Sequence, residues 1–236
     1  QGRSQNGRSD CAHEKGFCSL NQESAVGIPK VYGAEIPARG LTLLEGLYPI
    51  VEESLKADDG RGSLTATFLL SMAMPMIILP FERFDLKHDR AREIVIDREA
   101  VSVFRRAMKL NMSDVDWIHC GNWAYYKTEH KKPRIFLVPN GLPEFVEVAL
   151  NEQAAIDAKN ELTLGDVAEC FRHSLAHGNV AYLDEYGRTS YDGPASYLAF
   201  VCDLRRGAGS QILRLSLADF HRFLIVWGRW LQGFVN

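Results

Sequence analysis

Apolar residues recur every three or four positions along much of the chain, which is the spacing of helices with one buried face. This pattern begins at Leu41, and the turn sequence Asp58–Gly62 ends the first predicted helix. Gly178 follows a later predicted helix, at the position where glycine commonly ends helices. The other predicted helices cover Leu64–Leu79, Arg98–Leu110, Leu142–Lys159, Val167–His177 and Leu217–Phe234.

Short runs before the last helix have the composition of β-strands instead. Two of them, Val180–Tyr186 and Ala195–Leu204, flank a glycine-containing linker and predict a hairpin with a wide loop. Ile212–Leu215 predicts a third short strand, whereas the stretch 120–140 fits neither pattern clearly. Its segment Arg134–Pro139 suits either a strand or an extended connector. We therefore predict a mostly α protein, a helical bundle with a small β-hairpin insert before the C-terminal helix.

The N-terminal segment differs from the rest of the chain in composition. Residues 1–40 are rich in Gly, Ser, Asn, Arg and Pro and have weak periodicity. They predict a poorly ordered arm, with some ordered extended structure near Val26–Ile36. The remaining residues, 41–236, predict one helical domain, which agrees with a total length of 236 residues.

Composition and charge place the protein among ordinary soluble proteins. Hydrophobic residues make up 46% and charged residues 24%, which excludes a fully disordered chain. The net charge of −3 excludes a globally basic nucleic-acid coat, although it allows a local basic site. The five cysteines contain no CxxC pair, so we expect reduced thiols in a cytoplasmic protein with no metal or cofactor.

One apolar stretch has nearly the length of a membrane span. Leu64–Phe81 contains Pro75 and Pro80 together with Ser and Thr residues, and it lacks basic flanks. These features favour a buried core helix that ends near Pro80. We therefore expect no membrane association.

The segment Cys170–Asn179, C-F-R-H-S-L-A-H-G-N, combines residues that suit phosphodiester chemistry. Arginine can bind two oxygens of one phosphate, and histidine can give or take a proton near neutral pH. On a helix, His173 and His177 share a face, whereas Arg172 and His177 lie roughly 140° apart around the axis. Because one histidine cannot be acid and base in the same step, His177 would need a second copy from a symmetric dimer.

The run R-H-S-L-A-H-G resembles the R-x4-H signature of the HEPN superfamily, in which a polar residue follows the arginine near the end of a helix. The strand-like insert VAYLDEY to SYLAFVCDL and the helix LADFHRFLIVWGRWL resemble those of uncharacterised HEPN proteins of plasmids and other mobile elements. The resemblance covers residues 41–236. It implies a metal-independent endoribonuclease that cleaves single-stranded or loop RNA, in a defence or toxin–antitoxin setting with an antitoxin protein as partner.

The same resemblance implies a role for each motif residue. Arg172 would bind the scissile phosphate, His177 would be the acid or base, and His173 would orient or support them. Because one motif is an incomplete acid–base pair, we expect a homodimer with the helix Val167–His177 near the two-fold axis. The alternatives are a catalytically inactive HEPN module that binds RNA or a partner protein, a helical structural protein, and half of a metal site formed by the H-x3-H spacing.

A basic run is a second candidate RNA contact. KTEHKKPR, residues 127–134, follows three aromatic residues, a composition typical of surfaces that bind single-stranded RNA. A solvated loop beside core aromatics is the alternative. The predicted substrate-binding residues are Asn179, Lys131, Lys132 and Arg134.

Overall fold

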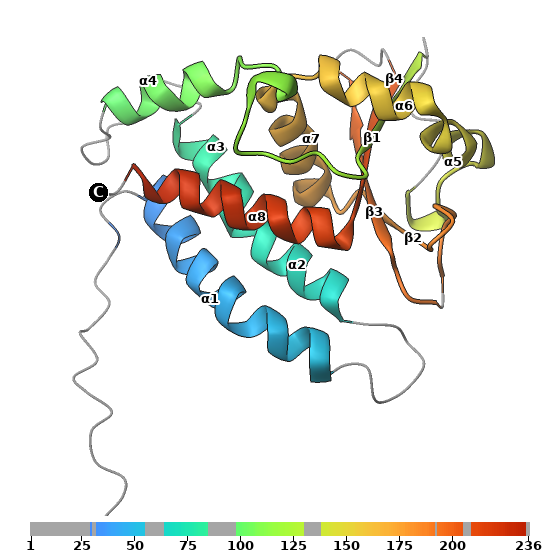
Figure 1. Cartoon of the computed structure of the whole chain (residues 1–236), viewed down its shortest axis with the longest axis horizontal. Coiled ribbons are helices and arrows are strands. Elements are labelled where there is room, and N and C mark those ends of the chain that lie inside the picture. The colour runs from blue at the N-terminus through green and yellow to red at the C-terminus, as the bar shows by residue number, and fades with distance from the viewer. Residues whose placement is uncertain are drawn as a thin grey trace, which may run out of the picture.

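The protein is described here from a computed structural model. The structure describes Pro29 and residues 32–54, 64–84, 98–129, 138–191, 193–204 and 209–234. It is mostly helical with a small antiparallel sheet (Figure 1), so the predicted fold class is confirmed at that level.

The helical elements are α1 (Tyr32–Ser54), α2 (Thr65–Ala73), the π-helix η1 (Met74–Ile78), α3 (Leu79–Phe84), α4 (Arg98–Ala107), α5 (Glu144–Asn151), α6 (Gln153–Ala158), α7 (Leu164–His177) and α8 (Leu217–Gln232). Short 3₁₀ turns are η2 (Met112–Asp114), η3 (Val138–Asn140) and η4 (Lys159–Glu161). The strands are β1 (Ala124–Glu129), β2 (Val180–Leu183), β3 (Tyr197–Asp203) and β4 (Gly209–Ser216).

Helix α1 begins at Tyr32, so the expected arm and the expected extended structure are wrong from this residue onward. The glycines that suggested a loop instead allow close helix packing. A Cβ added at Gly33 would lie 2.9 Å from Phe84 Cε2, and one at Gly40 would lie 2.9 Å from Met76 Cγ. Residues 1–28 of the predicted arm lie outside the described residues.

Elements α2, η1 and α3 form one continuous helix, Thr65–Phe84, which packs beside α1. Our prediction that it ends near Pro80 is wrong. Pro80 has no N–H and so cannot donate the usual helical hydrogen bond to the Met76 carbonyl four residues earlier. The indole Nε1 of Trp227 on α8 donates to that carbonyl instead, at 2.8 Å. A second proline, Pro75, lies inside the π-helical turn.

Burial of this helix explains its apolar composition. Within the described residues, Thr65–Phe84 is the one helix long and apolar enough to cross a membrane, properties that a buried core helix shares. Four of its side chains are completely buried in the main core: Leu69, Ala73, Met76 and Ile77.

The sheet has four antiparallel strands in the order β1-β4-β3-β2. The predicted hairpin is present as β2 and β3, and the predicted third strand is β4. Strand β1, which comes before α5 in the chain, was not predicted, so the β part is larger than a hairpin insert. Its register pairs Ala124 with Arg214.

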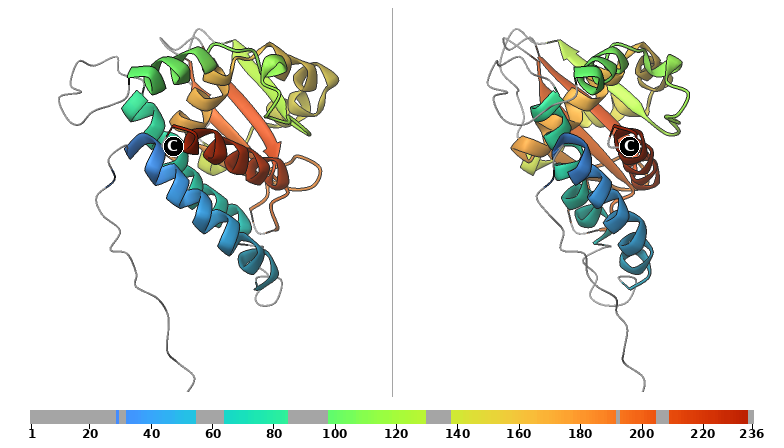
Figure 2. Two further views of the ribbon diagram at one scale, coloured as in Figure 1. Left: turned by 60° about the vertical axis from the view of Figure 1, so that its left-hand side comes forward. Right: turned by 90° about the vertical axis from the view of Figure 1, so that its left-hand side faces the viewer.

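The sheet separates two groups of helices (Figures 1 and 2). One face contributes Leu198, Phe200 and Leu213 to the main core, which it shares with α7 and α8. The other face contributes Ala199, Val201 and Ile212 to a smaller core under α5 and α6. These two helices were predicted as one, but the backbone is extended at Glu152 (φ −78°, ψ 150°) and interrupts the helix.

The Trp227 hydrogen bond can be tested against a matched tryptophan. Trp227→Phe should lower the free energy of unfolding, measured with urea, by about 1–3 kcal/mol more than Trp123→Phe, because it removes a buried hydrogen bond to the Met76 carbonyl. Trp123 is equally buried, but its indole Nε1 has no hydrogen-bond partner among the described residues. Equal losses in the two variants would contradict this role.

The contact between α1 and α8 includes a titratable ring stack. The rings of Tyr48 and His221 lie 3.6 Å apart and nearly parallel, at 6°. Burial lowers the pKa of His221 and outweighs the opposite effect of Glu52, while Arg222 lowers it further. The folded protein therefore binds a proton at His221 less readily than the unfolded chain does.

This lowered pKa predicts a pH-dependent stability. As pH falls below about 6.5, the ordinary histidine value, the unfolded chain gains the proton first, so the stability contributed at higher pH is lost. His221→Phe keeps a ring on Tyr48 and removes the titration. Its melting temperature should fall less than that of the wild type between pH 7.5 and pH 5.5. An identical pH dependence in both proteins would exclude His221 as a contributor.

Candidate functional site

Helix α7 carries the predicted motif, and local sequence signals fix both of its ends. Thr163 and Asp166 form a capping box in which each side chain accepts from the other residue's backbone N–H. At the C-terminal end Gly178 has φ 66°, the left-handed conformation that glycine adopts without strain. The predicted end at His177 and the predicted glycine cap are confirmed.

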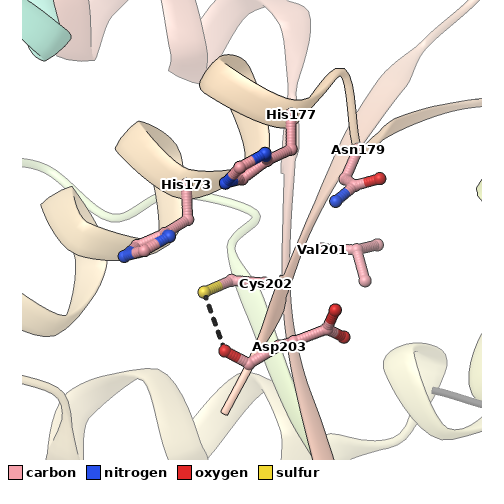
Figure 3. Close-up of a pocket in the computed structure, with 6 residues that line it drawn as sticks. All are labelled: His173, His177, Asn179, Val201, Cys202 and Asp203. Carbon is pink, nitrogen blue, oxygen red and sulfur yellow. Dashed lines mark hydrogen bonds between the residues drawn. The ribbon is translucent and has the colours of Figure 1, made fainter. Parts of the chain in front are cut away.

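The two histidines of the motif lie together at a pocket of about 400 Å³ (Figure 3). The ring centroids of His173 and His177 are 6.2 Å apart, with 23° between the ring planes. The two rings share one face of α7, as the helical spacing predicted, and that face lies beside strand β3. The pocket is lined by His173, His177, Asn179, Val201, Cys202 and Asp203.

The other pocket residues are held by the sheet. The carbonyl of Asn179 accepts a hydrogen bond from the backbone N–H of Val201 at 2.9 Å. Asp203 accepts one from the Ser210 hydroxyl on β4, also at 2.9 Å. The pocket therefore combines two imidazoles from the helix with an amide and a carboxylate near the sheet, so it contains groups that can transfer protons and bind a polar ligand.

Arg172 is not among the pocket residues. Its guanidinium Nε donates to the Glu82 carboxylate of α3 at 3.0 Å, and a terminal nitrogen contacts the same oxygen. This pair is partly open to solvent, because 30% of the Arg172 side chain and 52% of the Glu82 side chain are exposed. Within one chain the structure thus brings His173, His177 and Asn179 together and turns Arg172 toward a different helix.

The predicted basic RNA contact cannot be placed in the same way. Lys131, Lys132 and Arg134 lie outside the described residues. Of the aromatic residues beside them, Trp123 is buried in the core, where its ring contacts Phe171 edge to face. It therefore offers no stacking surface to RNA, which agrees with the core alternative for this residue.

The described part of the chain holds no cluster of metal ligands, and two of its cysteines, Cys120 and Cys170, are poorly suited to act as nucleophiles. No three His, Cys, Asp or Glu side chains come together there as metal ligands. Burial raises the pKa of the Cys170 thiol, and it raises that of Cys120 to about 11, so both remain thiols at neutral pH. A thiol is a poor nucleophile compared with a thiolate.

Val201, Cys202 and Asp203 line the pocket but were not predicted as site residues. They belong to no motif and lie more than twenty positions beyond His177. The hairpin offered one usable signal, because pairing of Val180 with Phe200 brings the next residue of β3 opposite Asn179. The register of the two strands was needed to use that signal.

Compared with known proteins, the chain matches no family model, no curated protein and no solved structure. The resemblance to the HEPN superfamily therefore stays a prediction that is based on the sequence pattern of residues 41–236.

Proposed function

We propose that the protein is a metal-independent endoribonuclease of HEPN type that cleaves single-stranded or loop RNA. The observation that carries the proposal is the pair of imidazoles, His173 and His177, on one pocket. A cytoplasmic defence or toxin–antitoxin system, with an antitoxin protein as partner, belongs to the same proposal.

Two imidazoles on one chain can supply both proton transfers of RNA cleavage. One takes the proton of the ribose 2′-OH as that oxygen attacks the phosphorus, and the other gives a proton to the departing 5′-oxygen. The products are a 2′,3′-cyclic phosphate and a 5′-hydroxyl. The step therefore consumes no water and requires no metal ion. His173 then has a direct acid–base role rather than a supporting one, and catalysis does not depend on a second copy of the motif.

The phosphate needs a positive charge or hydrogen-bond donors as negative charge develops on its oxygens. The Asn179 side-chain amide lines the pocket and can donate to one of these oxygens. Arg172 can contribute only after its guanidinium leaves Glu82, because the carboxylate now binds it. RNA phosphate competes with a carboxylate for the same geometry, since both accept two hydrogen bonds from a guanidinium.

The second candidate is a catalytically inactive HEPN module that binds RNA or a partner protein. The ion pair between Arg172 and Glu82 favours this candidate, because the motif arginine is bound by a carboxylate of the neighbouring helix α3 and does not line the pocket. This candidate expects RNA binding without cleavage, so a cleavage assay separates the two.

Removing either pocket histidine should abolish most of the activity. We expect His173→Ala and His177→Ala each to slow cleavage of a fluorescently labelled single-stranded RNA by about 10²–10⁴-fold, the usual contribution of an acid or base. His119→Ala removes an exposed histidine outside the pocket and should leave the rate unchanged.

Substrate and metal controls make this assay specific. Cleavage should persist in EDTA, and the DNA version of the oligonucleotide should stay intact because it lacks the 2′-OH. RNA binding without cleavage by the wild type would favour the inactive module. Equal rates for the wild type and both pocket variants would exclude these histidines as catalytic residues.

Breaking the Arg172–Glu82 pair should strengthen RNA binding. Glu82→Gln releases the guanidinium and should increase RNA affinity by about two- to fivefold, which corresponds to the energy of a surface ion pair. Fluorescence anisotropy measures this affinity. Glu45→Gln is a matched control, because it breaks a similarly exposed pair with Arg229. Unchanged or weaker binding by Glu82→Gln would mean that Arg172 does not contact the RNA.

A further inference from the structure

The exposed side of α1 carries an apolar stripe formed by Leu43, Gly46, Leu47 and Ile50. The exposed fractions of the three large residues are 52%, 42% and 59%. Their spacing of three and four places them on one face of the helix. Apart from the helix's own backbone, no atom of the described residues lies within 4 Å of the position that a Cβ of Gly46 would occupy, so an approaching surface can reach the backbone at this point. Figure 2 shows α1 at the outer edge of the helical layer.

The stripe matches itself when it is turned end for end. In an antiparallel pair centred between Gly46 and Leu47, Leu43 of one helix lies opposite Ile50 of the other. Each Gly46 then lies opposite a Leu47, which gives the alternation of small and large residues that lets two helices interlock. This self-match is the requirement for an interface between identical subunits related by a two-fold axis.

Charges beyond the two ends of the stripe favour the same antiparallel arrangement. Arg39 precedes the stripe, and its side chain stays 42% exposed while it forms an ion pair with Glu35. Glu53, which is exposed, follows the stripe in the last turn of α1. An antiparallel pair brings each Arg39 near the Glu53 of the other copy, and it also sets the two helix dipoles in the favourable opposite direction.

We propose that the Leu43–Ile50 stripe is a dimerisation face that binds α1 of a second copy of this chain in an antiparallel pair. The inference is independent of the proposed ribonuclease function. A helix of 23 residues is about 34 Å long, so the contact is small and we expect a dissociation constant that is on the order of 10 µM. Helix α7, which we expected at the two-fold axis, has no exposed large apolar residue.

Oligomeric state tests the proposal directly. Sedimentation equilibrium of the full chain should reveal a reversible dimer, and Leu47→Glu should weaken it by at least about tenfold. Val148→Glu on α5 is the matched control, because Val148 is 55% exposed and lies off the stripe. A wild type that stays monomeric up to about 300 µM, well above the expected dissociation constant, would overturn the proposal. Equal weakening by both variants would do so too.

A charge exchange tests the antiparallel orientation. Arg39→Glu and Glu53→Arg should each weaken the dimer, because each places like charges across the interface. The double variant should restore it, although the carboxylate introduced at position 39 would still repel Glu35 within its own helix. Restoration can therefore come only from the second copy. A double variant that is weaker than both single variants would exclude the antiparallel pair.

Disulfide trapping locates the axis. Gly46→Cys fits the open space at this position, and mild oxidation should link two copies covalently. Gln153→Cys, on the exposed side of α6, is the control for random cross-linking by an added surface thiol. Circular dichroism checks that each variant is folded. Trapping at Gly46 that is no faster than at Gln153 would exclude an axis beside Gly46.

Discussion

The hydrogen bond from Trp227 to the Met76 carbonyl determines how the helical layers fit together. The continuous helix Thr65–Phe84 contains two prolines, which would normally leave carbonyls without donors in the core. At Met76, inside the π-helical turn, the indole of Trp227 on α8 supplies a donor to the carbonyl. The bond also joins α8 to η1, a segment that packs against both α1 and α7. Helix α7, which carries the motif, therefore packs against a segment that this hydrogen bond stabilises.

The pocket depends on how firmly α7 is held against the sheet. The ring of Phe171 lies 4.7 Å from that of Phe200 on β3 and 5.0 Å from that of Phe223 on α8, so the helix cannot turn freely about its axis. With Phe171 directed inward, the helical period puts His173 and His177 on the side of β3. The same period puts Arg172 on the side of α3. The separation of arginine and histidines is thus a consequence of core packing, not of a preference of these polar side chains.

The parts of the fold that were predictable are those specified by local signals. The ends of α7 follow from a capping box and a C-terminal glycine, and the hairpin follows from two strand-like runs around a glycine-containing linker. Strand β1 was missed because its residues pair with residues of β4 that lie eighty or more positions away, and pairing at that distance leaves no local pattern. The start of α1 was missed because Gly33 and Gly40 serve tertiary contacts with α3 and η1. A sequence pattern cannot distinguish such glycines from those of a loop.

The same distinction applies to the site. That His173 and His177 share a face, and that Arg172 does not, followed from the helical period alone. The partner of Arg172 could not be predicted, because the direction of Glu82 depends on the π-helical turn before it. One extra residue in a helical turn rotates everything after it by about 100° around the axis. Glu82 follows the π-helical turn η1, so a regular helical count along the sequence does not give its direction. The ion pair of the motif arginine is therefore set by an irregular turn in a different helix, which the sequence pattern does not reveal.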